Sequence, residues 1–147
     1  MKVLKALRIE RCIGCHVCSM TCARLVHNIL SWESAGIRIR STGGISTGFE
    51  ARYCLSCKDP ACARPCPTEA IIVRRSGGIK IKRELCIKCK KCKDACPVEA
   101  ITLSPSGDPI VCIHCGLCTR FCPHGCLEMV KVNEEAPLND KSMEAAR

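Results

Sequence analysis

Residues 86–97 read C-I-K-C-K-K-C-K-D-A-C-P. Two residues separate each of the cysteines Cys86, Cys89 and Cys92, and three residues precede Cys96. Such close spacing lets one short loop wrap a small inorganic cube and aim three sulfurs at three of its corners. Pro97 then fixes the backbone and removes an N–H donor as the chain leaves the last cysteine. The spacing C-x2-C-x2-C-x3-C-P therefore predicts ligands of a [4Fe–4S] cluster.

The chain carries four such runs of cysteines. Run 2 is two residues longer in its middle than the others, and Ala23 replaces the proline after run 1, whereas Pro67 and Pro123 follow runs 2 and 4. An internal repeat accompanies the runs, because C-P-T-E-A-I at 66–71 matches C-P-V-E-A-I at 96–101. The runs are Cys12, Cys15, Cys18, Cys22 (run 1); Cys54, Cys57, Cys62, Cys66 (run 2); Cys86, Cys89, Cys92, Cys96 (run 3); and Cys112, Cys115, Cys118, Cys122 (run 4).

The cysteine content excludes several classes of protein. Of 147 residues, 17 are cysteines, a proportion that indicates a disulfide scaffold in a short secreted chain. Residues 1–11 contain no apolar signal-peptide segment, however, and an odd number of cysteines leaves one unpaired. No apolar run is long enough to span a membrane. We therefore expect metal ligands in a reducing compartment, and the packed runs favour iron–sulfur clusters over zinc, whose cysteine pairs usually lie a dozen or more residues apart.

The formal net charge of +9 invites a nucleic-acid partner, but it leaves out the metal. An oxidised [4Fe–4S] core with four thiolates carries about −2, so four clusters contribute about −8 and leave about +1. We therefore expect no nucleic acid among the partners. The chain has one Trp, one Tyr and two Phe, so its core should be thin and its folding coupled to cluster insertion.

Short strands and helices are predicted around the runs. Residues 1–11 are typical of an edge strand, and residues 19–30 of a short helix with Cys22 on its inner face. The I-R-I-R alternation within residues 31–51 favours a hairpin or a surface excursion, although a mobile loop fits the composition equally well. The segments that follow Cys66 and Cys96 predict β-hairpins. Residues 133–147 form a polar tail, either a frayed helix or disordered.

In the two-cluster ferredoxins of bacteria, the fourth cysteine of each run binds the other cluster. Applied to runs 2 and 3, this exchange gives Cys96 to run 2 and Cys66 to run 3. Runs 1 and 4 must then exchange Cys22 and Cys122. We call the resulting groups set 1 (Cys12, Cys15, Cys18, Cys122), set 2 (Cys54, Cys57, Cys62, Cys96), set 3 (Cys86, Cys89, Cys92, Cys66) and set 4 (Cys112, Cys115, Cys118, Cys22).

The predicted fold is α+β, with two bacterial-ferredoxin-like units that each hold two [4Fe–4S] clusters within short β-hairpins and short helices. The inner unit is inserted into the outer unit. Four cubes in so small a body should form a wire. The predicted parts are 1–30 and 106–132 (outer unit), 31–51 (insertion and partner contact), 52–105 (inner unit) and 133–147 (polar tail).

Cys126 is the seventeenth cysteine and belongs to none of the sets. A small buried residue is the favoured interpretation, and a spare ligand or a redox thiol are the alternatives. His16, His114 and His124 lie within or beside the runs. Since every run already has four cysteines, we expect these histidines to tune cluster potentials through hydrogen bonds rather than to bind iron.

Basic residues surround run 3. They form either a solvated surface or a site that raises the potential of the nearby cluster and docks an acidic partner. The residues are Lys80, Lys82, Arg83, Lys88, Lys90, Lys91 and Lys93.

Over roughly residues 1–130, the order of the runs resembles the four-cluster iron–sulfur subunits of the dimethyl sulfoxide reductase type. The longer spacing within run 2 is the most specific mark of this resemblance. Larger members often depart from the plain spacing in the fourth run and carry long insertions, whereas this chain is regular and short. Its compactness is similar to the small electron-transfer subunits of tungsten aldehyde oxidoreductases and class II benzoyl-CoA reductases, and to the accessory ferredoxins of hydrogenases and formate lyases.

The resemblance implies an anaerobic electron-transfer subunit. It would connect a larger catalytic subunit, with a tungsten or molybdenum pterin, to a ferredoxin, a flavin or NAD-linked protein, or a quinone. The residues themselves indicate a carrier rather than an enzyme, since each set supplies four cysteines and leaves no open iron, and no Gly-rich nucleotide loop is present. A free polyferredoxin and an assembly factor are the alternatives. Without a twin-arginine leader we expect a cytoplasmic complex, unless a partner carries the export signal.

Overall fold

The computed structural model describes residues 2–43 and 48–132. The helices are short, because in each run only a few residues lie between the cysteines and the turn that follows them. The helical elements are η1 (Ile9–Arg11), α1 (Val17–Val26), η2 (Arg83–Leu85), α2 (Lys91–Asp94) and α3 (Leu117–Phe121). The strands are β1 (Lys2–Lys5), β2 (Ile37–Ser41), β3 (Phe49–Tyr53), β4 (Ile71–Val73), β5 (Ile79–Ile81), β6 (Thr102–Leu103), β7 (Pro109–Ile110) and β8 (Glu128–Lys131).

The strands form four separate two-stranded antiparallel sheets. Three are local hairpins, β2–β3, β4–β5 and β6–β7. The two hairpins predicted after runs 2 and 3 are confirmed as β4–β5 and β6–β7. The fourth sheet pairs β1 with β8, so that Val3 lies opposite Val130. The first and last strands of the described residues are therefore neighbours.

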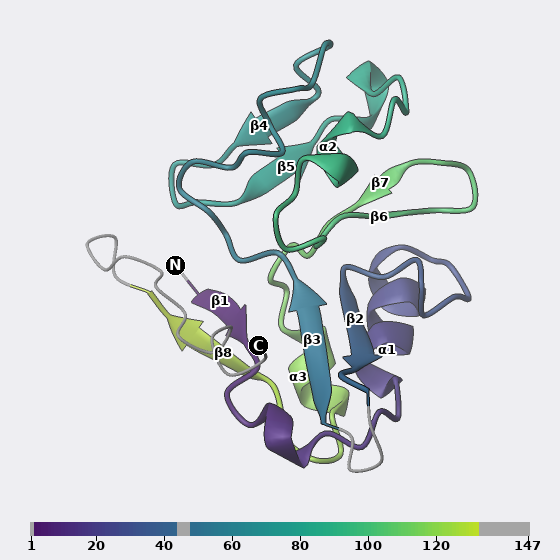
Figure 1. Ribbon diagram of the computed structural model, residues 1–147, viewed down its shortest axis with the longest axis vertical. Helices are drawn as coiled ribbons and strands as arrows, with labels where there is room; N and C mark the ends of the chain where they lie inside the picture. The colour runs from purple at the N-terminus through teal and green to yellow at the C-terminus, as the bar shows by residue number, and fades with distance from the viewer. Residues whose placement is uncertain (1, 44–47, 133–147) are drawn as a thin grey trace.

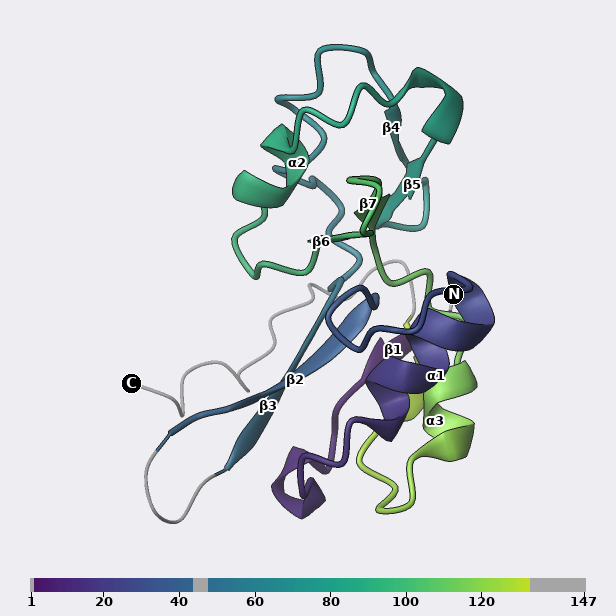
Figure 2. The ribbon, with the colours of Figure 1, turned by 90° about the vertical axis from the view of Figure 1, so that its right-hand side faces the viewer.

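Two lobes follow one another along the long axis of the molecule (Figure 1). The upper lobe of that view contains β4, β5, β6, β7 and α2, and the lower lobe contains β1, β2, β3, β8, α1 and α3. Figure 2 shows α1 and α3 side by side in the lower lobe. Runs 1 and 4 thus share one lobe, as the nested arrangement requires. That the lobes are two ferredoxin-like units, one inserted in the other, stays a prediction.

Each lobe has a small core of its own. In the lower lobe it includes Leu4, Ile37 and Tyr53 together with cysteines of runs 1 and 4. In the upper lobe Ile79 and Ile101 are buried beside cysteines of runs 2 and 3. A large part of both cores is therefore made of thiols, which agrees with the scarcity of aromatic residues.

The hairpin predicted as one alternative within residues 31–51 is confirmed as β2–β3, but it is not a surface excursion. Its alternation does form paired strands, but Ile37, Ile39 and Tyr53 are buried in the lower core. Burying one face of a strand fixes its register and gives it a structural role. The predicted boundary after residue 51 falls inside β3, and the one after residue 105 falls inside the β6–β7 hairpin.

Two other predicted elements have different bounds. The strand predicted over residues 1–11 ends at Lys5 and is followed by a turn and η1. The helix predicted over 19–30 is α1, which begins at Val17 and ends at Val26, with Cys22 buried as expected. Residues 44–47 of the insertion and the tail 133–147 lie outside the described residues. Among the described residues, no helix is both long enough and apolar enough to cross a membrane.

Candidate metal centres

Every run adopts the same unusual backbone conformation after its first cysteine. The second residue after that cysteine has a positive φ in all four runs: Gly14 (71°), Ser56 (56°), Lys88 (57°) and His114 (55°). Non-glycine residues rarely adopt this conformation. Backbone N–H groups that converge where the chain enters the left-handed region form concave sites for anions, including iron–sulfur clusters. Four independent loops thus share the backbone geometry of an anion site.

A second left-handed residue precedes the helix in three of the runs. It is His16 before α1, Lys90 before α2 and Gly116 before α3. The third cysteine of each of these runs is then the second residue of the helix and is buried. Run 2 has two additional residues, and a turn over residues 61–65 stands where the other runs have a helix.

Three of the predicted sets each surround a separate cavity. The cavity of set 3 measures about 400 Å³, that of set 4 about 330 Å³ and that of set 1 about 340 Å³, each including its open mouth. In each case the lining contains all four cysteines of the set, including the one contributed by the other run. The exchange of Cys22, Cys66 and Cys122 between runs is therefore matched by where the chain places their side chains.

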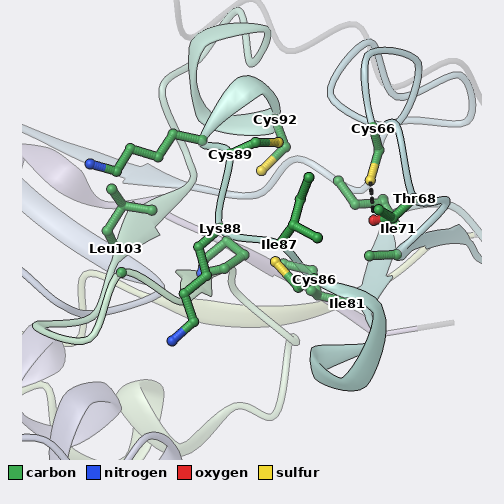
Figure 3. A pocket seen from close by; sticks show the side chains of 14 residues that line it. Cys66, Thr68, Ile71, Ile81, Cys86, Ile87, Lys88, Cys89, Cys92 and Leu103 are labelled. Carbon is green, nitrogen blue, oxygen red and sulfur yellow. Dashed lines mark hydrogen bonds between the residues drawn. The ribbon is translucent and has the colours of Figure 1, made fainter.

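Figure 3 shows the cavity of set 3 from close by. Cys86, Cys89 and Cys92 come from the loop of run 3 and the start of α2, whereas Cys66 stands apart at the end of run 2. Apolar side chains complete the lining: Ile87 lies between them in this view, Ile71 lies beside Cys66, and Ile81 lies beside Cys86. The two runs thus enclose one space together.

Set 2 is also brought together. The pKa of the Cys62 thiol rises to about 12, chiefly through burial and then through the neighbouring Cys96, Cys54 and Cys57. All four members of the set therefore lie close enough to influence one another. Among the described residues, no group of three or more His, Cys, Asp or Glu side chains is arranged to hold a single metal ion.

The last cysteine of each of three runs accepts a backbone hydrogen bond. The amide of Ala100 donates to Cys96 Sγ (3.3 Å), that of Cys126 to Cys122 Sγ (3.4 Å) and that of Gly36 to Cys22 Sγ (3.3 Å). Burial opposes ionisation of Cys122, but hydrogen bonds from the backbone amides of Cys126, His124 and Gly125 and from the Cys126 side chain outweigh it and lower the pKa of this thiol. Hydrogen bonds of this kind favour a thiolate, which is the form that binds iron.

Three cysteines of runs 1 and 4 are more deeply buried than Cys122. Burial raises the pKa of Cys18 to about 11 and that of Cys118 to about 12, and it also raises the pKa of Cys112. A buried thiolate without a nearby positive charge is unfavourable. Iron would supply that charge, so the metal-free protein should bind its clusters only as these thiols lose their protons.

Cys126 aligns with an alanine in each of the two copies of the internal repeat. C-P-H-G-C at 122–126 aligns with C-P-T-E-A at 66–70 and C-P-V-E-A at 96–100. Ala70, Ala100 and Cys126 are all buried, with 1%, 3% and 3% of their surface exposed. Cys126 is thus buried, as the favoured interpretation expects, and its role as a small packing residue rather than a ligand stays a prediction. Its side chain nevertheless lines the cavity of set 1.

His114 connects three segments of the chain, and both of its ring nitrogens are engaged in hydrogen bonds. The amide of Leu4 donates to its Nδ1 (2.9 Å), so the ring proton is on Nε2, which donates to Ser56 Oγ (2.7 Å). Burial, followed by the charges of Arg74 and Lys5, lowers the pKa of His114 to about 4. The neutral ring therefore ties the loop of run 4 to the loop of run 2.

Sequence reasoning missed His27 and Gly36. His27 follows α1 and lines the cavity of set 4, and Gly36 places its amide on Cys22. A Cβ at Gly36 would lie 2.9 Å from the Cys112 backbone, so only glycine allows this approach. Both residues lie outside the runs, and no spacing rule points to them.

The four lysines within run 3 divide into two groups. Lys88 is tied to the β6–β7 turn, because its Nζ lies 3.2 Å from Asp108 and 3.0 Å from the carbonyl oxygen of Ser106. Lys90, Lys91 and Lys93 are exposed, and no carboxylate of the described residues pairs with them. Lys88 and Lys90 both line the cavity of set 3.

Two family models match parts of the chain, and both describe a 4Fe–4S binding domain. One matches residues 79–102, which contain run 3, and the other matches residues 9–25 and 111–131, which contain runs 1 and 4. These matches support [4Fe–4S] clusters as the cofactors of the chain.

Several curated proteins are similar to the chain. It is 32% identical to the polyferredoxin-like subunit of an aliphatic sulfonate oxidoreductase from Pyrococcus furiosus, over 54% of this chain and 46% of that protein. It is 33% identical to a respiratory nitrate reductase beta chain from a Bradyrhizobium species, over 74% and 29%. It is 32% identical to the B component of the anaerobic dimethyl sulfoxide reductase of Haemophilus influenzae, over 55% and 45%. The matched part covers less than half of each relative.

Proposed function

We propose that the chain is a non-catalytic electron-transfer subunit that carries four [4Fe–4S] clusters, one in each of sets 1 to 4. It would connect a larger catalytic oxidoreductase subunit to a ferredoxin, a flavin or NAD-linked protein, or a quinone. A tungsten or molybdenum pterin is the proposed cofactor of the catalytic partner. The observation that carries this proposal is the order in which the four sets follow one another through the molecule.

Sets 1 and 4 are neighbours in the lower lobe. Burial is the main cause of the raised pKa of Cys118 in set 4, but the next cause is Cys18 of set 1. Both cysteines lie near the start of helices that pack against each other, α1 and α3. Clusters in these two sets would be close enough to exchange electrons directly.

Set 4 is in turn a neighbour of set 2, and set 2 of set 3. After burial, the charges that raise the pKa of Cys112 in set 4 include that of Cys54 in set 2. Cys62 of set 2 and Cys92 of set 3 are buried in the same core of the upper lobe. The spatial order of the sets is therefore set 1, set 4, set 2, set 3, with sets 1 and 3 at the two ends.

A linear order of this kind supports transport rather than catalysis. Each set has four cysteines, so each cluster would have every iron bound by protein, and its chemistry would be one-electron transfer. The thiolates of each set would hold its cluster, and at set 3 apolar side chains such as Ile71 and Ile81 would help to separate it from water. Cys89 of set 3 and Cys15 of set 1 are exposed, as is Cys115 of set 4, so electrons would be able to enter or leave at both ends and at set 4.

The names of the relatives support a role within a complex. They are described as a subunit or chain of an aliphatic sulfonate oxidoreductase, a nitrate reductase, a dimethyl sulfoxide reductase and a polysulfide reductase. Each name marks the relative as one of several chains of an oxidoreductase or reductase. We extend this role to the chain described here.

The native mass and metal content of the protein, purified without oxygen from its own cells, test this function. Elution with a larger subunit that carries tungsten or molybdenum, with about sixteen irons per copy of this chain, supports the proposal. Elution as a single chain with the same iron would instead identify a mobile polyferredoxin. Zinc in place of iron would contradict both.

A further inference from the structure

Within residues 2–43 and 48–132, two buried side-chain polar atoms have no hydrogen-bond partner. They are Nδ1 of His16 and Nε2 of His27. Buried polar groups are almost always paired, because an unpaired group has lost its hydration without compensation. Two unpaired imidazole nitrogens in so small a protein therefore call for a partner.

Each of these histidines lines the cavity of one set of cysteines. His27 lines the cavity of set 4, together with Cys22, Cys112, Cys115 and Cys118. His16 lines the cavity of set 1, where its ring also contacts Trp32 at a centroid distance of 5.6 Å. In the described part of the chain, both unpaired atoms thus belong to side chains at proposed cluster sites of the lower lobe.

The charge of the sites determines which form of the ring fits. A cluster with four thiolates is negative, so a nitrogen that faces it is stabilised as an N–H donor and destabilised as a lone pair. Burial, followed by Arg83, lowers the pKa of His27, and either charge state of the ring can carry a proton on Nε2. With that proton on Nε2, the unpaired nitrogen becomes a hydrogen-bond donor, and a donor is the group that a negative cluster stabilises.

We propose that the Nε2–H of His27 donates a hydrogen bond to a sulfur of the cluster held by set 4, and that the Nδ1–H of His16 does the same at set 1. The proposal rests on the cluster assignment under the proposed function. Hydrogen bonds to the sulfurs raise the reduction potential of a cluster, because they stabilise the more negative reduced state. Both histidines are therefore tuning residues rather than ligands.

The two ends of the proposed wire differ in the polar side chains beside their clusters. The cavity of set 3 is lined by Lys88 and Lys90, and no histidine is among its lining residues in the described part of the chain. Set 1, at the other end, has the proposed N–H donor His16. The potential of one end is thus set by nearby ammonium charges and that of the other by an imidazole N–H.

The first test uses the unmodified protein with its full complement of iron, labelled with ¹⁵N in the histidine rings. Pulsed electron paramagnetic resonance (EPR) of the reduced protein should show a ¹⁵N hyperfine coupling and an exchangeable-proton coupling that disappears in D₂O. If the protein shows [4Fe–4S] signals without these couplings, the proposed hydrogen bonds are wrong, while the proposed electron-transfer function is not contradicted. Protein without any [4Fe–4S] signal contradicts the proposed function itself.

The second test uses variants of His27. His27→Leu removes the donor, and it should lower the midpoint potential of one cluster and remove part of the ¹⁵N coupling. His27→Gln keeps an N–H and should restore the potential toward that of the parent. Leu25→Ala in α1, two residues before His27, changes a side chain that is 57% exposed; it is the control and should leave every potential unchanged. Equal potentials in the parent and in His27→Leu, with iron retained, would overturn the proposal.

Discussion

Nε2 of His114 lies 2.7 Å from Oγ of Ser56 and donates its proton to that hydroxyl. The two residues occupy equivalent left-handed positions in runs 4 and 2, so the contact joins the loop of one proposed cluster to that of the next. Ser56 is 1% exposed. The contact lies where the lower lobe meets the upper lobe, since Cys112 and Cys54 are the neighbouring members of sets 4 and 2.

Ser56→Ala should destabilise the protein by about 1–3 kcal/mol, because it leaves the buried N–H of His114 without an acceptor. The thermal midpoint of the iron-loaded protein and its rate of iron release to a chelator are the measurements. The control is Ser76→Ala, which changes an exposed serine in the β4–β5 turn. Equal iron-release rates for the two variants would show that the contact carries no stability.

The exchange of fourth cysteines between runs 1 and 4 leads to a second prediction. Cys22 lines the cavity of set 4 although it belongs to run 1. Cys22→Ser should therefore alter the same EPR signal as Cys115→Ser, and Cys122→Ser should alter the same signal as Cys15→Ser. A match between Cys22→Ser and Cys15→Ser instead would place all four ligands of each cluster within one run.

Much of the four cysteine sites can be predicted from the sequence, because the loops and hairpins that form them depend on residues close together in the chain. The spacing of cysteines predicts the loops, and the repeat predicts the β4–β5 and β6–β7 hairpins, since a turn and two short strands depend on adjacent residues. The alanine at positions 70 and 100 of the repeat also indicates that Cys126 stands in a small buried site. These features need no knowledge of distant contacts.

Other features depend on contacts between distant segments. His27 reaches the cavity of set 4 only because α1 packs on α3 and ends at Val26, one residue earlier. The hairpin β2–β3 looks like a surface excursion from its arginines, yet its apolar face covers the lower core through Ile37 and Ile39. Neither placement has a signature in residue spacing, because both arise from tertiary packing.

The repeat also predicts what Cys126 does. Cys126→Ala should retain the full iron content, because alanine occupies the equivalent buried positions 70 and 100. The backbone N–H of residue 126 that bonds Cys122 Sγ is unchanged by the substitution. Iron analysis and the EPR spectrum are the measurements. Loss of about four irons per chain, the content of one cluster, would instead make Cys126 a ligand of set 1.

The exposed lysines beside set 3 lead to the last prediction. Lys90 lines the cavity of set 3 and Lys91 begins α2, and neither pairs with a carboxylate of the described residues. Their positive charges stabilise the reduced state of a nearby cluster, so the double substitution Lys90→Gln and Lys91→Gln should lower the potential of one cluster in a redox titration. The effect should shrink as salt rises, because the screening length falls to about 10 Å at 0.1 M.

The matched control is the double substitution Lys2→Gln and Lys131→Gln. These two exposed lysines lie opposite each other on β1 and β8 in the lower lobe, so the control removes the same charge far from set 3. It should leave the affected cluster at its parent potential. If both double variants shift all clusters equally, the lysines act only through the net charge of the protein. If neither shifts any cluster, the lysines beside run 3 form a solvated surface with no influence on electron transfer.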